Sequence, residues 1–317
     1  MTRFVLTRLG LLVIAWIAAS LLVFATLRLL PGDVAQVIGG VQASPARLAE
    51  LREQLGLDRP VAVQYLDWIG GFFTGDLGTS ALTGTPVAAE LAQKAQVTIP
   101  LTLMSLLVLL AVAVPTGVFA AYRSGRASSR AISAGALLTA AVPTVAVGLL
   151  AILVGAGWLG WLPAQGFPRD GWQDPLRALR ALVLPALTIG LVEGAVLFRF
   201  VRSATLTALD ADHVRTARAQ GLTRPRALLE HGLPGVGLSI VSVLGLQIAA
   251  LIVGAVVVEQ LFSLPGLGRM LVGDVGNRDL PKVQSTLLVL TGVILLIGAL
   301  VDVIHRAIDP RLRSAAS

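Results

Sequence analysis

Long apolar runs without a charged residue place the strongest constraint on how this chain can fold. Five such runs lie at residues 9–27, 97–122, 131–165, 235–258 and 283–301. As a helix that rises about 1.5 Å per residue, each is long enough to cross about 30 Å of hydrocarbon. A sixth run, 181–198, is interrupted only by Glu193. We therefore predict an all-α, polytopic membrane protein with six transmembrane helices.

The composition agrees with a membrane protein. Of the 317 residues, 55% are hydrophobic and only 14% are charged, which is too little polar material to cover a soluble globule of this size. The chain has no cysteine, so disulfides and thiolate-ligated metals are excluded. Its net charge is +7, but the basic residues are scattered among apolar runs and form no nucleic-acid-binding patch. We interpret the first run, closed by Arg28, as a retained anchor and not as a signal peptide.

Arginine and lysine in the connections predict the orientation. They are denser in segments 1–8, 122–130, 199–235 and 305–317 than in 31–97, 158–182 and 259–284. Because basic connections remain in the cytoplasm, both termini are expected there. The predicted parts are an N-terminal segment with the first span (1–30), an extracytoplasmic helical insertion (31–97), a membrane core (98–309) containing a cytoplasmic loop (207–235), and a cytoplasmic tail (310–317).

A polar, mostly basic stretch, "DADHVRTARAQGLTRPRALLEHGLP", occupies residues 210–234. Asp210 or Asp212 can cap a first helix, which Gly221 can end in a left-handed conformation. Thr223 can then cap a second helix with Pro225 in its first turn. A helix of two turns is marginal in water, so something must hold it. As an alternative to two helices held by a partner, residues 210–234 can form a basic loop that lies on the lipid headgroups.

Within this stretch, "RTARAQG" followed by "HGLP" resembles the cytoplasmic signature of permease subunits of binding-protein-dependent ABC importers. Arg215 stands where the general signature has Glu, and Thr216 where it has the first Ala. With these two residues the stretch resembles the form that the signature takes in the peptide-importer branch. The resemblance continues in "LPGD" at 30–33, "LGLDRPVAVQYLDWIGGFFTGDLGTS" at 55–80, "VVVEQLFSLPGLGRML" at 256–271 and "DPRLR" at 309–313.

The resemblance implies a type I ABC importer permease fold in which this stretch is a coupling helix that docks on a cytoplasmic ATPase. Arg215 and Arg218 offer charge to acidic rims, and Val214 and Ala217 form a small apolar face at i, i+3 spacing. The implied coupling residues are Asp212, Val214, Arg215, Thr216, Ala217, Arg218, Gly221 and Leu222.

The ATPase itself has to be a separate subunit. The only lysines are Lys94 and Lys282, and neither follows a glycine, so the chain has no phosphate-binding loop. The resemblance implies a second homologous permease, two nucleotide-binding subunits that hold ATP and Mg²⁺, an external binding protein, and lipid of a bacterial cytoplasmic membrane. We expect no cofactor or metal in this chain and no activity as an enzyme.

The outer segment is expected to form two short helices folded on one another, one starting at Ser44 and one at Pro60. Tyr65 and Trp68 are candidates for docking the binding protein, although these aromatics can equally pack the small cap or lie at the membrane interface. Pro265, Gly266 and Gly268 belong to a second outer candidate, a shaped connection after the fifth run.

Glu193 and Gln247 are the candidate polar contacts of a translocation path. An unpaired charge inside a span costs about 3 kcal/mol on insertion scales, so Glu193 should face protein or water, and a structural partner is as plausible as cargo. Gln247 can also bond across helices. His213, His231 and His305 are dispersed without metal-ligand spacing.

The resemblance to the peptide branch implies a dipeptide or oligopeptide cargo. Its members also carry nickel chelates, glutathione or haem, so these remain alternatives. An ion-coupled secondary transporter should show paired intramembrane acids and two related halves. A membrane-embedded hydrolase should show a nucleophile and a base within its spans. Neither pattern is evident.

Overall fold

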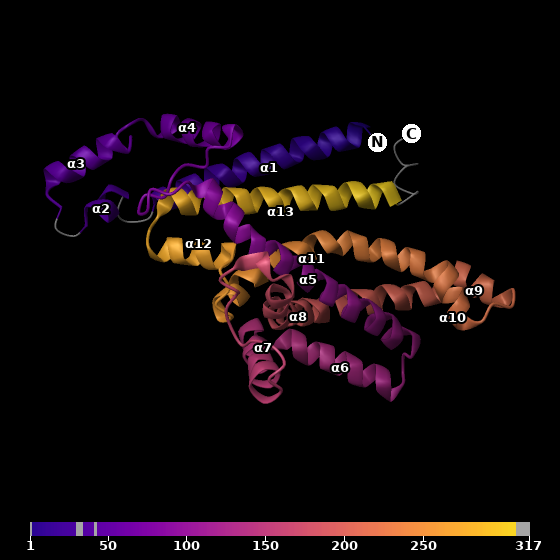
Figure 1. The fold of residues 1–317 in the computed structure, drawn as a ribbon. Coiled ribbons are helices and arrows are strands. Elements are labelled where there is room, and N and C mark those ends of the chain that lie inside the picture. The colour runs from indigo at the N-terminus through magenta and orange to yellow at the C-terminus, as the bar shows by residue number, and fades with distance from the viewer. Residues whose placement is uncertain (1, 30–33, 41–42, 309–317) are drawn as a thin grey trace. The chain divides into compact units, whose positions relative to one another are not determined.

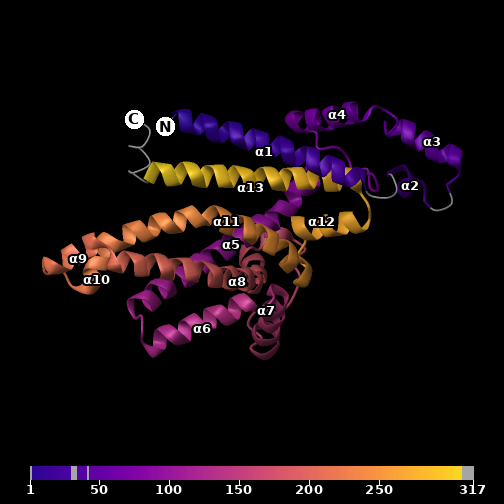
Figure 2. The same ribbon diagram turned by 180° about the vertical axis from the view of Figure 1, so that it is seen from behind.

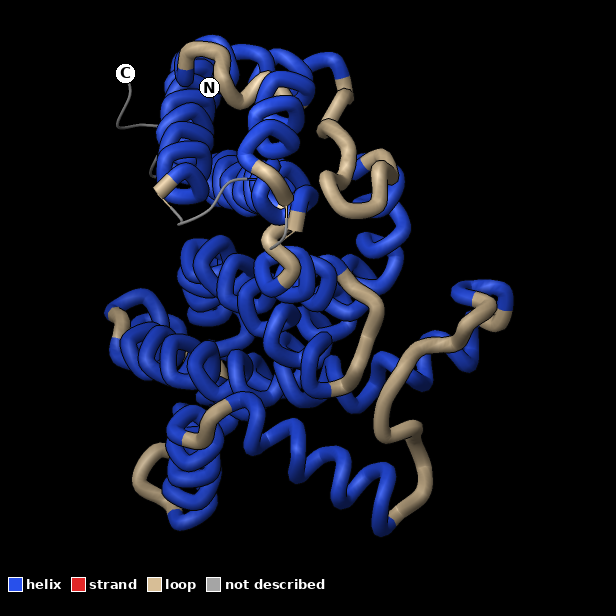
Figure 3. Tube along the Cα trace, turned by 90° about the vertical axis from the view of Figure 1, so that its left-hand side faces the viewer, coloured by secondary structure: helices blue, strands red, loops and turns tan. Residues whose placement is uncertain are grey.

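The computed structural model describes residues 2–29, 34–40 and 43–308. Every regular element in this part of the chain is a helix (Figures 1 and 3), as the sequence predicts. The motifs at 30–33 and 309–313, and the tail at 310–317, lie outside the described residues. The α-helices are α1 (Thr2–Arg28), α2 (Val34–Gly39), α3 (Pro45–Gln54), α4 (Val61–Thr74), α5 (Val87–Tyr122), α6 (Ala127–Ala141), α7 (Thr144–Ala151), α8 (Pro175–Asp210), α9 (Asp212–Ala219), α10 (Arg224–Ala227), α11 (Leu233–Leu261), α12 (Leu267–Gly276) and α13 (Leu280–Ile308).

Five helical segments are long and apolar enough to cross a membrane. They are Phe4–Arg28, Val87–Tyr122, Pro175–Asp210, Arg224–Leu261 and Leu280–Ile308. The remaining predicted run, 131–165, is not one straight helix. Ala127–Ala141 and Thr144–Trp158 are bent by 107° at a short break, because Val142 precedes Pro143 and is extended (φ −85°, ψ 132°). The described spans number six, as predicted, only if this bent pair crosses as one.

The described residues form two compact units. The first contains residues 98–265 and the part of α13 from residue 297 onward. Its centre is α8, which packs against α6, α7 and α11 and buries most of its apolar window. Glycines of α8 allow this helix to approach α5 closely. A Cβ on Gly190 of α8 would lie 2.8 Å from the carbonyl oxygen of Ser105 on α5.

The second unit contains Thr2–Val97 and Gly266–Leu296. As predicted, Ser44 caps α3 by accepting a hydrogen bond from the Arg47 amide at 3.3 Å, and α4 begins after Pro60. The expectation that these two helices fold on one another is wrong. Helix α3 packs against α2, whereas α4 places its aromatic side chains against α1, with the rings of Phe72 and Trp16 4.8 Å apart.

Candidate functional site

The candidate coupling loop lies between α8 and α11 (Figure 2). Helix α9 begins after Ala211, which is extended (φ −68°, ψ 142°) and provides no side-chain cap. The predicted capping by Asp210 or Asp212 is therefore wrong, and Asp212 lies in the first turn. Gly221 has φ +98°, the left-handed conformation that the sequence predicts. Thr223 is the residue before α10, although its side chain makes no capping hydrogen bond.

The small apolar face of α9 is turned into the loop's own core. Val214 and Ala217 are buried and pack with Ala227, and the partly buried Leu222 packs against them. A helix of two turns needs such packing to persist. These side chains therefore hold the loop together, and the contact of Val214 and Ala217 with an ATPase stays a prediction.

The exposed face of the loop is polar and basic. Arg215, Thr216 and Arg218 are exposed. Arg215 lies 3.9 Å from the Asp212 carboxylate, with side chains that are 64% and 100% exposed, so this pair contributes little. Both guanidinium groups are thus available to a carboxylate on another molecule.

Gln247 connects two helices of the first unit. Its side chain is 5% exposed, and its Nε2 donates a hydrogen bond to the backbone oxygen of Glu193 at 3.0 Å. The amide therefore bonds across α11 and α8, one of the two roles that the sequence allows. The Glu193 side chain is half-buried.

Glu259 of α11 is a fully buried carboxylate that the sequence did not indicate. Its side chain is fully buried, and Thr98 Oγ1 donates a hydrogen bond to its Oε1 at 2.5 Å. The apolar run ends at residue 258, but α11 continues to Leu261. Helical continuation past the run was the signal that could have placed Glu259 inside a span.

The second unit holds a cluster of charges that the sequence did not bring together. Lys282 Nζ lies 2.5 Å from Glu90 Oε2 and 3.1 Å from Asp274 Oδ1, and the Lys282 side chain is only 8% exposed. Burial raises the pKa of the Asp274 carboxyl above its usual value, while the hydrogen bond and charge of Lys282 act in the opposite direction. Nearby, Asp279 accepts hydrogen bonds from the Ser80 hydroxyl and the Ala81 amide.

The candidate docking residues of the outer segments differ in exposure. The Tyr65 and Ser20 hydroxyls are hydrogen-bonded at 2.7 Å, and Trp68 stacks on Phe24 with ring centroids 6.0 Å apart. The two aromatics are half-buried and pack on α1, whereas the alternative interpretation expects them in the small cap or at the membrane interface. Of the second set, Pro265 is exposed, whereas Gly266 and Gly268 are buried.

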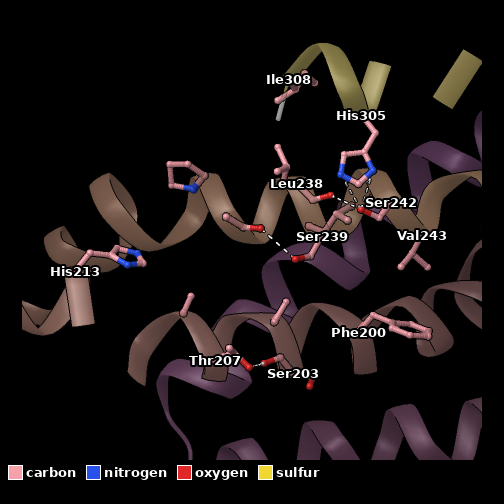
Figure 4. A pocket seen from close by; sticks show the side chains of 15 residues that line it. Phe200, Ser203, Thr207, His213, Leu238, Ser239, Ser242, Val243, His305 and Ile308 are labelled. Atoms are coloured by element: carbon pink, nitrogen blue, oxygen red, sulfur yellow. Dashed lines mark hydrogen bonds between the residues drawn. The ribbon is translucent and has the colours of Figure 1, made fainter. Parts of the chain in front are cut away.

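A groove of about 900 Å³ opens beside the candidate coupling loop in the first unit (Figure 4). It is lined by α8, α11, the end of α13 and His213 of α9. His213 Nε2 donates a hydrogen bond to the backbone oxygen of His231 at 3.1 Å, and His305 lies against Ser242 at 3.1 Å.

Between two of its candidate membrane spans, the chain carries a short helix with exposed arginines, a glycine turn and a second helix. In a chain with several membrane-spanning helices, this arrangement is typical of a transport permease. Residues 113–314 match the family "Binding-protein-dependent transport system inner membrane component", and residues 1–102 match its N-terminal family. The chain belongs to this family and is a multi-pass protein of the inner membrane.

Known proteins resemble it over nearly its whole length. A putative peptide transport system permease protein of Brucella abortus (strain 2308) is 37% identical over 313 residues, which is 99% of each chain. The glutathione transport system permease protein GsiC of Salmonella typhimurium shows the same identity and coverage. Among solved structures, the MetNI methionine ABC transporter matches with a TM-score of 0.56 and 20% identity, over 69% of this chain and 96% of that one. At this identity the match shows the permease fold alone.

Proposed function

We propose that this chain forms half of the pathway of an ATP-driven importer of short peptides, and that α9 couples the pathway to a separate ATPase. The exposed basic face of α9 carries the proposal. Arg215 and Arg218 are accessible, while the opposite face of the helix is fixed in the loop's own core. A rigid helix with outward guanidinium groups is suited to push and pull against an acidic partner surface.

The partners follow from the same proposal. Membership of a binding-protein-dependent family supports an external binding protein, a second permease subunit and two nucleotide-binding subunits that hold ATP and Mg²⁺. The missing phosphate-binding loop supports an ATPase outside this chain. For docking the binding protein, Pro265 remains a candidate because it is exposed.

The cargo proposal rests on relatives. Several similar proteins are named as peptide transport permeases, which supports dipeptides or oligopeptides. GsiC is named for glutathione, itself a tripeptide, and this makes glutathione the second candidate.

A pair of glycine variants tests the coupling. Gly221 and Gly125 both have positive φ (+98° and +88°), and a Cβ at either position would meet nothing within 4 Å. Valine imposes the same backbone strain, of about 1–3 kcal/mol, at both. In the purified complex we expect Gly221→Val to reduce substrate-stimulated ATP hydrolysis and uptake at least about tenfold, and Gly125→Val to leave both nearly unchanged. Full transport by an inserted Gly221→Val subunit would contradict the coupling role.

Uptake in cells tests the cargo. In a strain without other peptide importers, deletion of this subunit should abolish uptake of labelled dipeptides and oligopeptides and confer resistance to toxic peptide analogues. Unchanged peptide uptake together with lost uptake of glutathione, nickel chelate or haem would reassign the cargo.

A further inference from the structure

The groove beside the candidate coupling loop has a mostly apolar lining, in which three hydroxyl groups already donate their hydrogens to backbone carbonyls. Thr207 Oγ1 donates to the Ser203 carbonyl at 3.2 Å, Ser239 Oγ to the Gly235 carbonyl at 3.1 Å, and Ser242 Oγ to the Leu238 carbonyl at 2.9 Å (Figure 4). A hydroxyl that donates to a carbonyl retains lone pairs that accept. The groove therefore presents oxygen acceptors from two facing helices, α8 and α11.

The two imidazoles of the groove follow the same pattern. His213 donates its Nε2 hydrogen to the His231 carbonyl, as the hydroxyls donate to backbone carbonyls. Because Ser242 donates to Leu238, its contact with His305 is one in which the imidazole donates. The described side chains that line the groove include no carboxylate, lysine or arginine. The groove thus offers several weak acceptors and no carboxylate.

We propose that this groove is a transient exit site for the cargo, where the hydroxyls of Thr207, Ser239 and Ser242 accept hydrogen bonds from the ammonium and amide N–H groups of a short peptide. The proposal rests on the proposed function. A volume of about 900 Å³ falls within the range of about 300–1,000 Å³ that holds small molecules. Neutral acceptors bind an ammonium without the strength of a carboxylate, and a site on a conduction path has to release its ligand readily.

The position of His213 links this site to the coupling loop. His213 belongs to α9, whereas the other lining side chains belong to α8, α11 and α13. A movement of α9 driven by the ATPase therefore changes one wall of the groove. Binding at this site and the state of the ATPase would be coupled through that wall.

A bulky substitution tests whether cargo passes through the groove. Ser239 is exposed and lines the groove, and Ser239→Trp fills part of it. Leu246 lies two helical turns further along α11, is 75% exposed and does not line the groove, so Leu246→Trp is the matched control. In the reconstituted complex we expect Ser239→Trp to lower peptide uptake at least about tenfold while ATP hydrolysis continues. Ser239→Ala removes one acceptor and should weaken apparent peptide affinity by roughly 2–10-fold.

A photoreactive dipeptide, alanyl-p-benzoylphenylalanine, tests occupancy directly in the same complex. Labelled fragments from residues 200–208 or 234–243 would support the exit site. Labelling of this chain only elsewhere, or labelling of the groove by a photoreactive phosphatidylethanolamine but not by the dipeptide, would overturn it in favour of another route or of a lipid site. Normal uptake by Ser239→Trp, with uptake abolished by Gly221→Val, would overturn the exit site and leave the proposed function standing. Normal uptake by both variants would overturn the exit site and the coupling role of α9 together, whereas absence of peptide uptake by the unmodified complex would remove the proposed function itself.

Discussion

Lys282 is a buried cation that lies between two carboxylates, and it is far less exposed to solvent than the ion pairs on the surface of the same unit. Its side chain is 8% exposed, whereas those of Arg47 and Glu50 in the same unit are 53% and 54% exposed. Exposed pairs contribute about 0–1 kcal/mol. Removing one member of a buried pair costs about 3–5 kcal/mol, because the remaining charge is left without compensation.

We therefore expect Lys282→Met to destabilise the protein by about 3 kcal/mol, and Arg47→Met by less than about 1 kcal/mol. Thermal unfolding of the purified subunit in detergent measures the difference. A triple variant, Glu90→Gln with Asp274→Asn and Lys282→Met, removes the uncompensated charges and should recover much of the loss. Equal effects of the two methionine variants would show that the Lys282 cluster is not a stabilising element.

At the scale of the element, the close packing of α8 against α5 depends more on Gly190 than on Gly194, which lies one turn further along α8. A Cβ at Gly190 would lie 2.7 Å from Val108 Cβ and 2.8 Å from the Ser105 carbonyl oxygen, whereas at Gly194 the nearest atoms are 3.6 Å away. Alanine gains about 1 kcal/mol over glycine in a helix interior. Overpacking costs about 1–3 kcal/mol where the neighbour cannot move.

We expect Gly190→Ala to destabilise the first unit by about 1–2 kcal/mol, and Gly194→Ala to be neutral or slightly stabilising. Both residues lie on α8 one turn apart, so propensity is matched and only the contact differs. Thermal unfolding of the two variants is the measurement. If Gly190→Ala were as stable as Gly194→Ala, the close contact between α8 and α5 would be excluded.

The sequence predicts elements well where local chemistry decides them. Gly221 and the Ser44 cap lie where the sequence places them because turn and cap geometry depend on a few adjacent residues. Hydrophobic runs locate most spans, but they do not report a bend, so the 107° break at Pro143 was missed.

Contacts between distant residues could not be predicted in this way. The sequence shows that Val214 and Ala217 form one apolar face, but it does not show that Ala227 packs against this face. Lys282 meets Glu90 across nearly two hundred positions of sequence, and no local pattern encodes such a pairing.

At the scale of the whole molecule, orientation is the expectation on which the coupling proposal depends. Because the chain has no cysteine, single replacements are clean thiol probes. Thr83 and Ser124 are both exposed, whereas the nearby Ser80 is buried and unsuitable. Basic connections stay in the cytoplasm, so an impermeant maleimide added to intact spheroplasts should label Thr83→Cys and not Ser124→Cys. After permeabilisation both should react to the same extent, which controls for access. The reverse pattern in intact spheroplasts would place the loop containing Arg215 outside, away from ATP, and coupling through α9 would then be untenable.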